Sequence, residues 1–394
     1  MIIVRCIVIG LAYIGLGLGY LPFLRMNRTS IAISSAALLM ALGVLDLKEA
    51  WAAIDDQTLI FLFGMMIVSA NLEAAGFFQL SLDYLMRYVH SPFGLMVAIT
   101  FGSGILSALF LNDTIALILT PLVLGLARSL NLNPIPYLLA LAGATNCGSV
   151  ATLSGNPQNI LIGSFSGISY LDFAIALTPL ALVSLIIQIC LLWVLYPEVR
   201  SFKSCLNATP RPYRLFKPLL IKSLLITGAL LIAFLIAIPP AEATLIAAGL
   251  LFITRLKPER FLRKIDWDLL VMFSGLFILT AGVQKLGLLN GFTPFVHTPL
   301  SVLGVTALLS NLVSNVPAVL LLQHLIPHPN TRTWLLLAAA STLAGNLTLL
   351  GSVANLIVAE AVRNLGHSLT FWEHLRFGLP LTVMTLGLTY IWLY

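Results

Sequence analysis

Apolar residues fill most of this chain in runs long enough to cross a lipid bilayer. About 20 apolar residues span the hydrocarbon core as a helix, and on that rule the pattern predicts eight simple spans. The predicted spans cover residues 2–20, 29–45, 57–76, 171–196, 218–238, 241–255, 268–286 and 371–393. The pattern therefore predicts an all-α polytopic membrane protein.

Four further apolar stretches do not fit a simple span. Residues 92–130 and 294–330 carry polar residues at their middles, whereas residues 135–166 and 333–363 are each about 30 residues long, more than one crossing needs. We interpret the first pair as re-entrant hairpins that return to their own side of the membrane, and the second pair as broken helices that cross once. The chain then has about ten crossings plus two re-entrant hairpins.

Composition agrees with this interpretation and excludes several function classes. Of 394 residues, 59% are hydrophobic and 9% are charged, against roughly 25% charged in a soluble domain. The net charge of +6 is spread too thinly to form a nucleic-acid surface, so no nucleic-acid partner is expected. The Walker A, H-E-x-x-H and G-x-S-x-G motifs are absent, which excludes the simplest ATPase, metalloprotease and serine-hydrolase functions. Four cysteines without C-x-x-C spacing are expected to be free thiols: Cys6, Cys147, Cys190 and Cys205.

Basic residues are concentrated on one side of the predicted bilayer. All but four of the 21 Lys and Arg residues fall in loops on that side; the exceptions are Arg5, Lys48, Lys285 and Arg332. The positive-inside rule therefore predicts a cell inner membrane protein with both termini outside the cytoplasm. The first apolar stretch lacks a small-residue cleavage site and is expected to be a span, not a signal peptide.

The two halves of the chain repeat each other in three ordered blocks. Their matches are Ile54-Asp55 with Ile265-Asp266, Ser107 and Asn112 with Ser310 and Asn315, and TLSGNPQN with TLLGSVAN through the pattern T-x-x-G-x-x-x-N. Because each half has an odd number of crossings, the second repeat is predicted to be inverted relative to the first. The predicted organisation is a first inverted repeat at 1–197, a basic cytoplasmic linker at 198–217 and a second inverted repeat at 218–394.

The breaks carry helix-start chemistry. Irregular backbone inside a membrane is tolerated where it is buried or lines a polar cavity, so the four odd segments are expected to converge. Asn and Ser cap helices and Pro suits the first turn, and such residues stand at each break: Asn112, Asn156 before Pro157, Asn315 two residues before Pro317, and Ser352. Four half-helix N-termini would then point their positive dipole ends at one midplane cavity, where an anion or a polar hydroxide binds.

Asp113 is the acid that has long apolar runs on both sides. An ionisable residue inside a membrane is a functional-site hypothesis by default, and no basic residue lies within the predicted midplane segments. Asp113 is therefore predicted to bind the coupling cation or to carry the coupling proton; the alternative is a protonated acid that caps the hairpin helix. Carbonyls freed near Gly148 and Gly345 suit sodium, which makes Gly148, Asp113 and Gly345 a candidate sodium site.

Substrate and ion contacts are predicted for the polar residues of the hairpin tips and breaks. They are Asn112, Asp113, Thr114, Asn146, Thr152, Gly155, Asn156, Asn159, Ser314, Asn315, Asn346, Thr348, Gly351, Ser352 and Asn355. A scaffold role, tying hairpins to broken helices through hydrogen bonds, stays open for Asn112, Asn159, Asn315 and Asn355. Cys147 is interpreted as a small buried side chain, with a thiophilic metalloid ligand as the alternative, and His324 as an interfacial polar residue.

The hairpin and break segments carry a family resemblance. SALFLNDTIALILTPLV, ATLSGNPQNILIG, SNLVSNVPAVLLL and TLLGSVANLIVAE are similar to segments of the ion transporter superfamily that contains arsenite permeases, NhaD-type sodium/proton antiporters and divalent-anion/sodium symporters. The first segment is especially similar to the arsenite-permease and NhaD side. The dicarboxylate branch has Ser-Asn-Thr at both tips, whereas these tips read Asn112-Asp113-Thr114 and Ser314-Asn315-Val316. The missing threonine and the charge of Asp113 favour a ligand smaller than a dicarboxylate.

These observations predict a secondary active transporter and not an enzyme. Its substrate is expected to be a small inorganic ion or weak-acid oxide, arsenite-like or an inorganic anion, moved by alternating access. No cofactor is expected beyond sodium or a proton as coupling ion, and a homodimer is a candidate assembly. The alternatives are a sodium-coupled di- or tricarboxylate or sulfate symporter, an ion channel and, less favoured by the inverted repeat, an intramembrane enzyme.

Overall fold

The computed structural model describes residues 2–21, 24–87, 89–201, 215–254, 256–326, 329–364 and 369–394. These residues form helices and no strand, so the all-α prediction is confirmed. The first half contains α1 (Ile2–Leu18), α2 (Arg28–Ala41), α3 (Leu47–Ala52), α4 (Asp56–Ala75), α5 (Phe77–Met86), α6 (Pro92–Leu109), α7 (Asn112–Ser129), α8 (Ile135–Ser149), α9 (Pro157–Ser166) and α10 (Tyr170–Leu195). The second half contains α11 (Lys217–Leu235), α12 (Pro240–Phe252), α13 (Glu259–Leu262), α14 (Trp267–Lys285), α15 (Pro299–Val313), α16 (Asn315–Leu325), α17 (Thr331–Ala344), α18 (Val353–Asn364) and α19 (Phe371–Leu393).

Each predicted simple span coincides with a helix. Residues that cap helices stand at the ends of the apolar runs. At α4, for example, the Asp55 carboxylate accepts from the Thr58 N–H at 2.7 Å, and Gly76 ends the helix with a φ of 86°. Among the described residues, the helices long and apolar enough to cross a membrane unaided are α4, α6, α10, α11 and α14. The protein is therefore a multi-pass membrane protein, while the total of ten crossings stays a prediction.

The four odd segments are divided into helix pairs as predicted, while their re-entry or crossing of the membrane stays a prediction. Helices α6 and α7 pack against each other as a hairpin, as do α15 and α16. The long stretch 135–166 is divided between α8 and α9, and the stretch 333–363 between α17 and α18. We call residues 150–156 the first break and residues 345–352 the second break.

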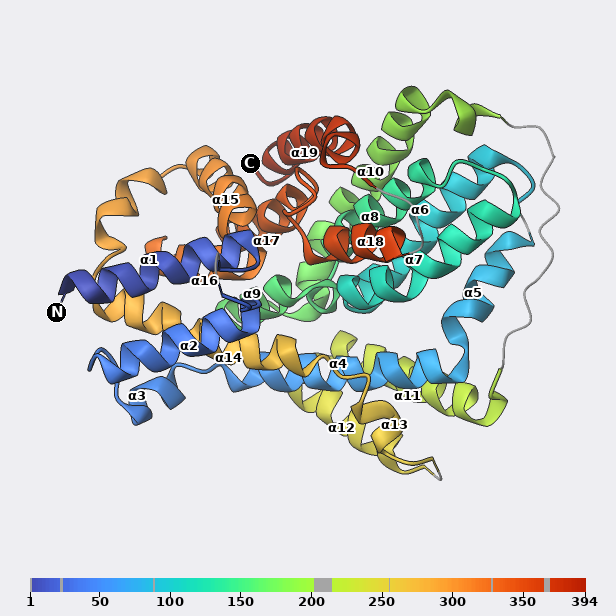
Figure 1. The fold of residues 1–394 in the computed structure, drawn as a ribbon. Coiled ribbons are helices and arrows are strands. Elements are labelled where there is room, and N and C mark those ends of the chain that lie inside the picture. Colours follow the sequence, from blue (N-terminus) through green and yellow to red (C-terminus); the bar gives the residue numbers. More distant parts are fainter. Residues whose placement is uncertain are drawn as a thin grey trace.

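The two halves pack in matching ways (Figure 1). Each hairpin lies on its own half's broken helix, α6 on α8 and α15 on α17. The second arm of each hairpin contacts the broken helix of the other half, α7 with α18 and α16 with α9. In Figure 1 the helices α2, α4, α11, α12 and α14 form a layer below the hairpins and broken helices. Within that layer the halves cross over, because α2 packs on α14 and α4 packs on α12.

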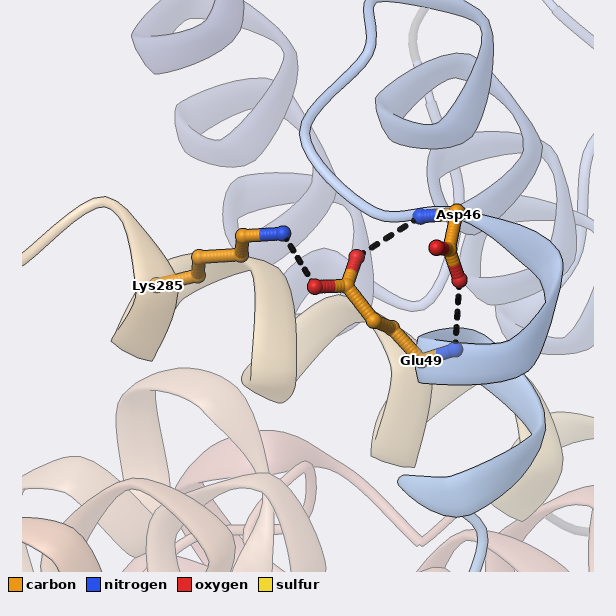
Figure 2. A network of polar contacts seen from close by, with 3 residues as sticks. All are labelled: Asp46, Glu49 and Lys285. Carbon is orange, nitrogen blue, oxygen red and sulfur yellow. Dashed lines mark hydrogen bonds and ion pairs between the residues drawn. The ribbon is translucent and has the colours of Figure 1, made fainter.

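Two ion pairs join the halves at the ends of this layer. Lys285 at the end of α14 pairs with Glu49 of α3 at 2.5 Å, and Asp46 and Glu49 form the capping box of α3 (Figure 2). Lys264, between α13 and α14, pairs with Glu73 near the end of α4, also at 2.5 Å. Helices α4 and α14 are the equivalent third spans of the two halves. Each pair joins the segment before one of these helices to the end of the other. The arrangement repeats with the signs of the charges exchanged.

Orientation in the membrane is tested by thiol labelling. We expect a cysteine placed at Tyr394 to react with a membrane-impermeant maleimide added outside intact cells, because the basic loops hold the other side in the cytoplasm. A cysteine at Lys257, in one of those basic loops, is the matched control and should react after lysis alone. Labelling of position 394 only after lysis would contradict the crossing count and the inverted repeat together.

Candidate substrate and ion site

The four half-helix N-termini converge on one cavity, as the sequence predicts. This central cavity has a volume of about 40 Å³ and lies where the starts of α7, α9, α16 and α18 meet α14. Its polar lining residues are Arg28, Asn112, Asp113, Gln158, Ser314, Asn315 and Ser352. The unpaired N–H groups of four helix starts therefore surround a small, polar, mostly buried space.

Arg28 corrects one sequence-based expectation. It is the first residue of α2 and was predicted to lie in a loop, yet it lines the central cavity together with Asp113. Its Nε donates to the Leu16 carbonyl at 3.1 Å, which holds the side chain in place. Arg28 and Asp113 interact electrostatically but form no ion pair within the described part of the chain. The expectation that no basic residue lies near Asp113 was wrong, because the starts of α2 and α7 line the same cavity.

Asn159 and Asn355 make the same contacts at the two breaks. The Asn159 amide nitrogen donates to the carbonyls of Ser149 at 3.0 Å and Thr152 at 2.9 Å. The Asn355 amide nitrogen donates to the carbonyls of Gly345 at 2.9 Å and Thr348 at 3.2 Å, which are the equivalent positions. Each asparagine thus bridges the carbonyl at the end of the interrupted helix and a carbonyl within the break, which matches the scaffold interpretation.

The breaks are also joined to each other across the pseudo-symmetry axis. The Asn156 amide donates to the Thr342 hydroxyl at 3.1 Å, and the Ser352 hydroxyl donates to the Asn146 amide oxygen at 3.0 Å. At the repeat shift of the breaks these two hydrogen bonds are equivalent. Asn146 also donates to the Asn346 amide oxygen at 2.9 Å and accepts from Asn112 at 3.3 Å. Asn146 is therefore the centre of a buried amide network directly behind the central cavity.

The predicted caps are correct at one break and wrong at both hairpin tips. Asn156 caps α9 by accepting from the Asn159 N–H at 2.9 Å, with Pro157 in the first turn. Asn112 and Asn315 instead occupy the first positions of α7 and α16, which have no side-chain cap. With its amide nitrogen turned toward carbonyls, Asn315 donates to Ser341 at 3.1 Å and to Gly351 at 3.2 Å. Contacts to the broken helices, not capping, therefore decide the orientation of these two tip asparagines.

The remaining predicted residues either contribute to the structure of the breaks or line one of the cavities. Thr152 donates to the Ala108 carbonyl, and Thr348 to the Asn311 side chain at 3.2 Å, again at equivalent positions. At Gly155 an added Cβ would lie 2.2 Å from the Ser149 carbonyl oxygen, so the first break requires glycine there. At Gly351 an added Cβ would lie 2.6 Å from the Asn311 side chain. Thr114 lies outside the central cavity and lines the neighbouring one, whereas Ser314 lines the central cavity with a φ of 80°.

The carbonyls of the candidate sodium site already accept hydrogen bonds. Gly148 accepts from the Ala151 N–H at 3.1 Å, and Gly345 accepts from Asn355. A sodium ion at either carbonyl would have to share or replace these donors. The candidate sodium site near Gly148 and Gly345 stays a prediction that the contacts do not favour.

His374 is a buried polar residue that the sequence reasoning missed. Its Nε2 lies 3.0 Å from the Asn346 carbonyl oxygen and 3.4 Å from the Asn355 amide, so it contacts the second break from α19. The three residues between Thr370 and His374 are ordinary for a helix start, and no signal in the sequence separates this histidine from an interfacial one. Cys147 is buried with its Sγ 3.5 Å from the Asn346 amide, while Cys6 and Cys190 are exposed free thiols. Cys205 lies outside the described residues.

Two further cavities lie on either side of the central one along α14, and we name them inner and outer after the predicted orientation. The inner cavity, of about 100 Å³, shares Asp113, Pro157 and Leu269 with the central cavity. The outer cavity, of about 310 Å³, is lined by the later part of α14 and by His324 of α16, and it shares no lining residue with the central cavity. In this conformation the central cavity adjoins the inner cavity, on the side of Lys264, which the positive-inside prediction assigns to the cytoplasm.

Paired hairpins and broken helices around one polar cavity, in a multi-pass helical protein, define a membrane transporter built from inverted repeats. The chain belongs to the citrate transporter family, CitMHS, whose sequence profile matches residues 13–342. The resemblance to the ion transporter superfamily is thereby confirmed.

Relatives along nearly the whole chain are also transporters or membrane proteins. The silicon efflux transporter LSI3 of rice is 34% identical, over 92% of this chain and 91% of its own length. The inner membrane protein YbiR of Escherichia coli is 31% identical, over 87% of this chain and 89% of its own length. Among solved structures, the YdaH transporter of Alcanivorax borkumensis superposes with a TM-score of 0.55 at 14% identity, covering 93% of this chain and 96% of that one. The last likeness shows the fold alone.

Proposed function

We propose that this protein is a secondary active transporter of the inner membrane that moves a small inorganic solute, best described as a neutral, hydroxylated weak acid of the silicic or arsenous acid type. The observation that carries the proposal is the central cavity. Its volume of about 40 Å³ has room for only a few water-sized groups, since one water needs roughly 10–15 Å³ by this measure. A hydroxylated oxide of one central atom suits that space, whereas citrate does not.

The charges around the cavity support a neutral or weakly charged ligand. Arg28 and Asp113 stand on the same cavity without pairing, so the site offers one positive and one negative group. The Asn112 amide oxygen is buried and has no partner within the described residues, which leaves an acceptor for a ligand hydroxyl. Hydroxyl groups that donate to Asn112 and Asp113 and accept from Arg28 and the helix-start N–H groups would satisfy all of these positions. The relative LSI3 is named for the efflux of silicon, which belongs to the same solute class.

Alternating access is supported by the arrangement of the cavities. The central cavity adjoins the inner cavity through Asp113 and is separated from the outer cavity near Phe277 and Leu320. A carrier needs this one-sided access, whereas a channel would need a path continuous from one side to the other. Asp113, which borders both the substrate cavity and the inner side, is our candidate for coupling transport to sodium or protons.

The family name makes a carboxylate symporter the alternative substrate assignment, and the sulfate symporter stays the alternative that the sequence resemblance left open. Purified protein in liposomes is to be loaded with silicic acid, arsenite, sulfate or citrate, with a sodium or a proton gradient imposed. We expect gradient-dependent movement of silicic acid or arsenite and no competition by citrate. Saturable citrate transport would overturn the proposal in favour of the symporter, and flux far above the stoichiometric supply of coupling ions would favour a channel.

A further inference from the structure

The inner cavity holds more negative charge than its surroundings neutralise. Its charged lining residues are Glu73, Asp113, Lys264 and Asp266. Lys264 is paired with Glu73 at 2.5 Å, so the carboxylates of Asp113 and Asp266 remain. They lie close enough to repel each other, and Arg28, which attracts Asp113, stands on the central cavity and not on this one. Asp266 is exposed and Asp113 is half-buried, so a cation that reaches the cavity past Asp266 can neutralise both carboxylates, and the one at Asp113 is costly to leave without a cation.

A buried hydroxyl without a partner lines the same space. The side chain of Ser69, on α4, is 1% exposed, and its Oγ has no hydrogen-bond partner within the described residues. A hydroxyl in a helix normally bonds the carbonyl four residues earlier or a neighbouring group. An unsatisfied buried hydroxyl next to a polar cavity of about 100 Å³ points to a ligand that supplies the missing contact.

Asp266 caps α14 with one carboxylate oxygen and has a second oxygen that the cap does not use. One of its oxygens accepts from the Leu269 N–H at 3.0 Å, which caps α14. Its equivalent in the first repeat, Asp55, caps α4 in the same way and uses its second oxygen to accept from the Ser164 hydroxyl at 2.8 Å. Among the described residues Asp266 has no such second donor, and it lines the inner cavity. Both carboxylate oxygens of Asp55 thus accept hydrogen bonds, whereas one carboxylate oxygen of Asp266 is left for a ligand.

We propose that the inner cavity binds one monovalent cation between Asp113 and Asp266, with the Ser69 hydroxyl as a neutral ligand. The inference rests on the proposed function, because we assign the bound cation as the coupling ion, sodium or a proton. Asp113 then borders both sites, with the substrate in the central cavity and the cation in the inner one. Loading of the cation removes the repulsion between the two carboxylates and changes the charge that the substrate meets at Asp113.

Cation binding is to be measured without any substrate, so that failure of this proposal is distinct from failure of the transport assignment. The probe is thermal unfolding of the purified full-length protein in sodium chloride against potassium chloride at constant ionic strength, repeated across pH. A ligand that binds the folded state raises the unfolding temperature with its concentration. A rise with sodium identifies sodium, and a sodium-independent rise as the pH falls identifies a proton.

Asp266→Asn and Asp55→Asn form the matched pair. Asparagine caps as well as aspartate, so both variants should fold, but only Asp266→Asn should raise the cation concentration for half-maximal effect, by about tenfold, within the usual range for coupled sites. Asp55→Asn should respond as the wild type does. An unchanged cation response in Asp266→Asn would overturn the proposal, as would an equal loss in both variants.

Ser69→Ala keeps the proposal testable if Asp266→Asn does not fold. Removing an unpartnered buried hydroxyl should leave stability unchanged or raise it in the absence of the cation. If the hydroxyl is a cation ligand, the same variant should weaken the response to the cation. A stable Ser69→Ala protein with a wild-type cation response would exclude Ser69 as a ligand and contradict the site as proposed.

Discussion

Asp113→Asn is expected to fold and to bind substrate, yet to lose transport against a gradient. A neutral amide keeps the shape of the side chain in the central cavity but removes the charge that attracts a cation or carries a proton. Uphill accumulation should therefore fall to the level of simple equilibration, while exchange of substrate at equal concentrations continues. Uptake into liposomes with and without an imposed sodium or proton gradient measures both.

The neighbouring Thr114 provides the control for this prediction. It lines the inner cavity beside Asp113 but carries no charge, so Thr114→Val should disturb coupling far less than Asp113→Asn. An Asp113→Asn protein that still drives uphill transport with unchanged gradient and pH dependence would show that Asp113 is a protonated residue of the hairpin tip. Coupling would then have to be sought elsewhere, for example at the carbonyls near Gly148 and Gly345.

Asn159→Ala and Asn355→Ala are expected to destabilise the protein to a similar degree and to abolish transport. Each substitution removes one amide that serves two carbonyls of a break. A buried polar group that loses a hydrogen-bond partner costs about 1–3 kcal/mol, and each variant removes a donor from two carbonyls of a break. Thermal unfolding and substrate uptake of both variants, measured side by side, check the prediction.

Asn133→Ala is the control for the two break variants. Asn133 is an exposed asparagine in the loop between α7 and α8, outside both breaks, and its amide donates to the Glu198 carboxylate. It should leave transport unchanged. Normal transport by both Asn159→Ala and Asn355→Ala would show that the T-x-x-G-x-x-x-N pattern is not needed for function. A strong effect of one variant alone would contradict the equivalence of the two repeats.

The lengths of the apolar runs and the local residue patterns are enough to predict a large part of this fold from the sequence. The span at 57–76 corresponds to α4 and the span at 371–393 to α19, because a helix that crosses lipid needs a length that the chain displays directly. The T-x-x-G-x-x-x-N pattern indicates the repeat, because the same break needs the same residues: a glycine where a Cβ would clash and an asparagine that bridges two carbonyls. The cap of α9 by Asn156 is equally local and was predictable for that reason.

Only the tertiary structure decided which charges and amides meet. Arg28 lines the same cavity as Asp113 although 84 other residues separate them in the chain, since the fold brings the starts of α2 and α7 to one site. Asn112 and Asn315 have the residue type of a cap, yet their amides reach carbonyl or amide oxygens across the fold, so the tertiary partners override the local preference. His374 and Ser69 carry no distinguishing pattern, and the repeat pairs Asp266 with Asp55 without indicating its unpartnered oxygen, because such contacts depend on which helices pack together. Local geometry is encoded within a few residues, whereas the electrostatics of the site arise between segments that the sequence keeps far apart.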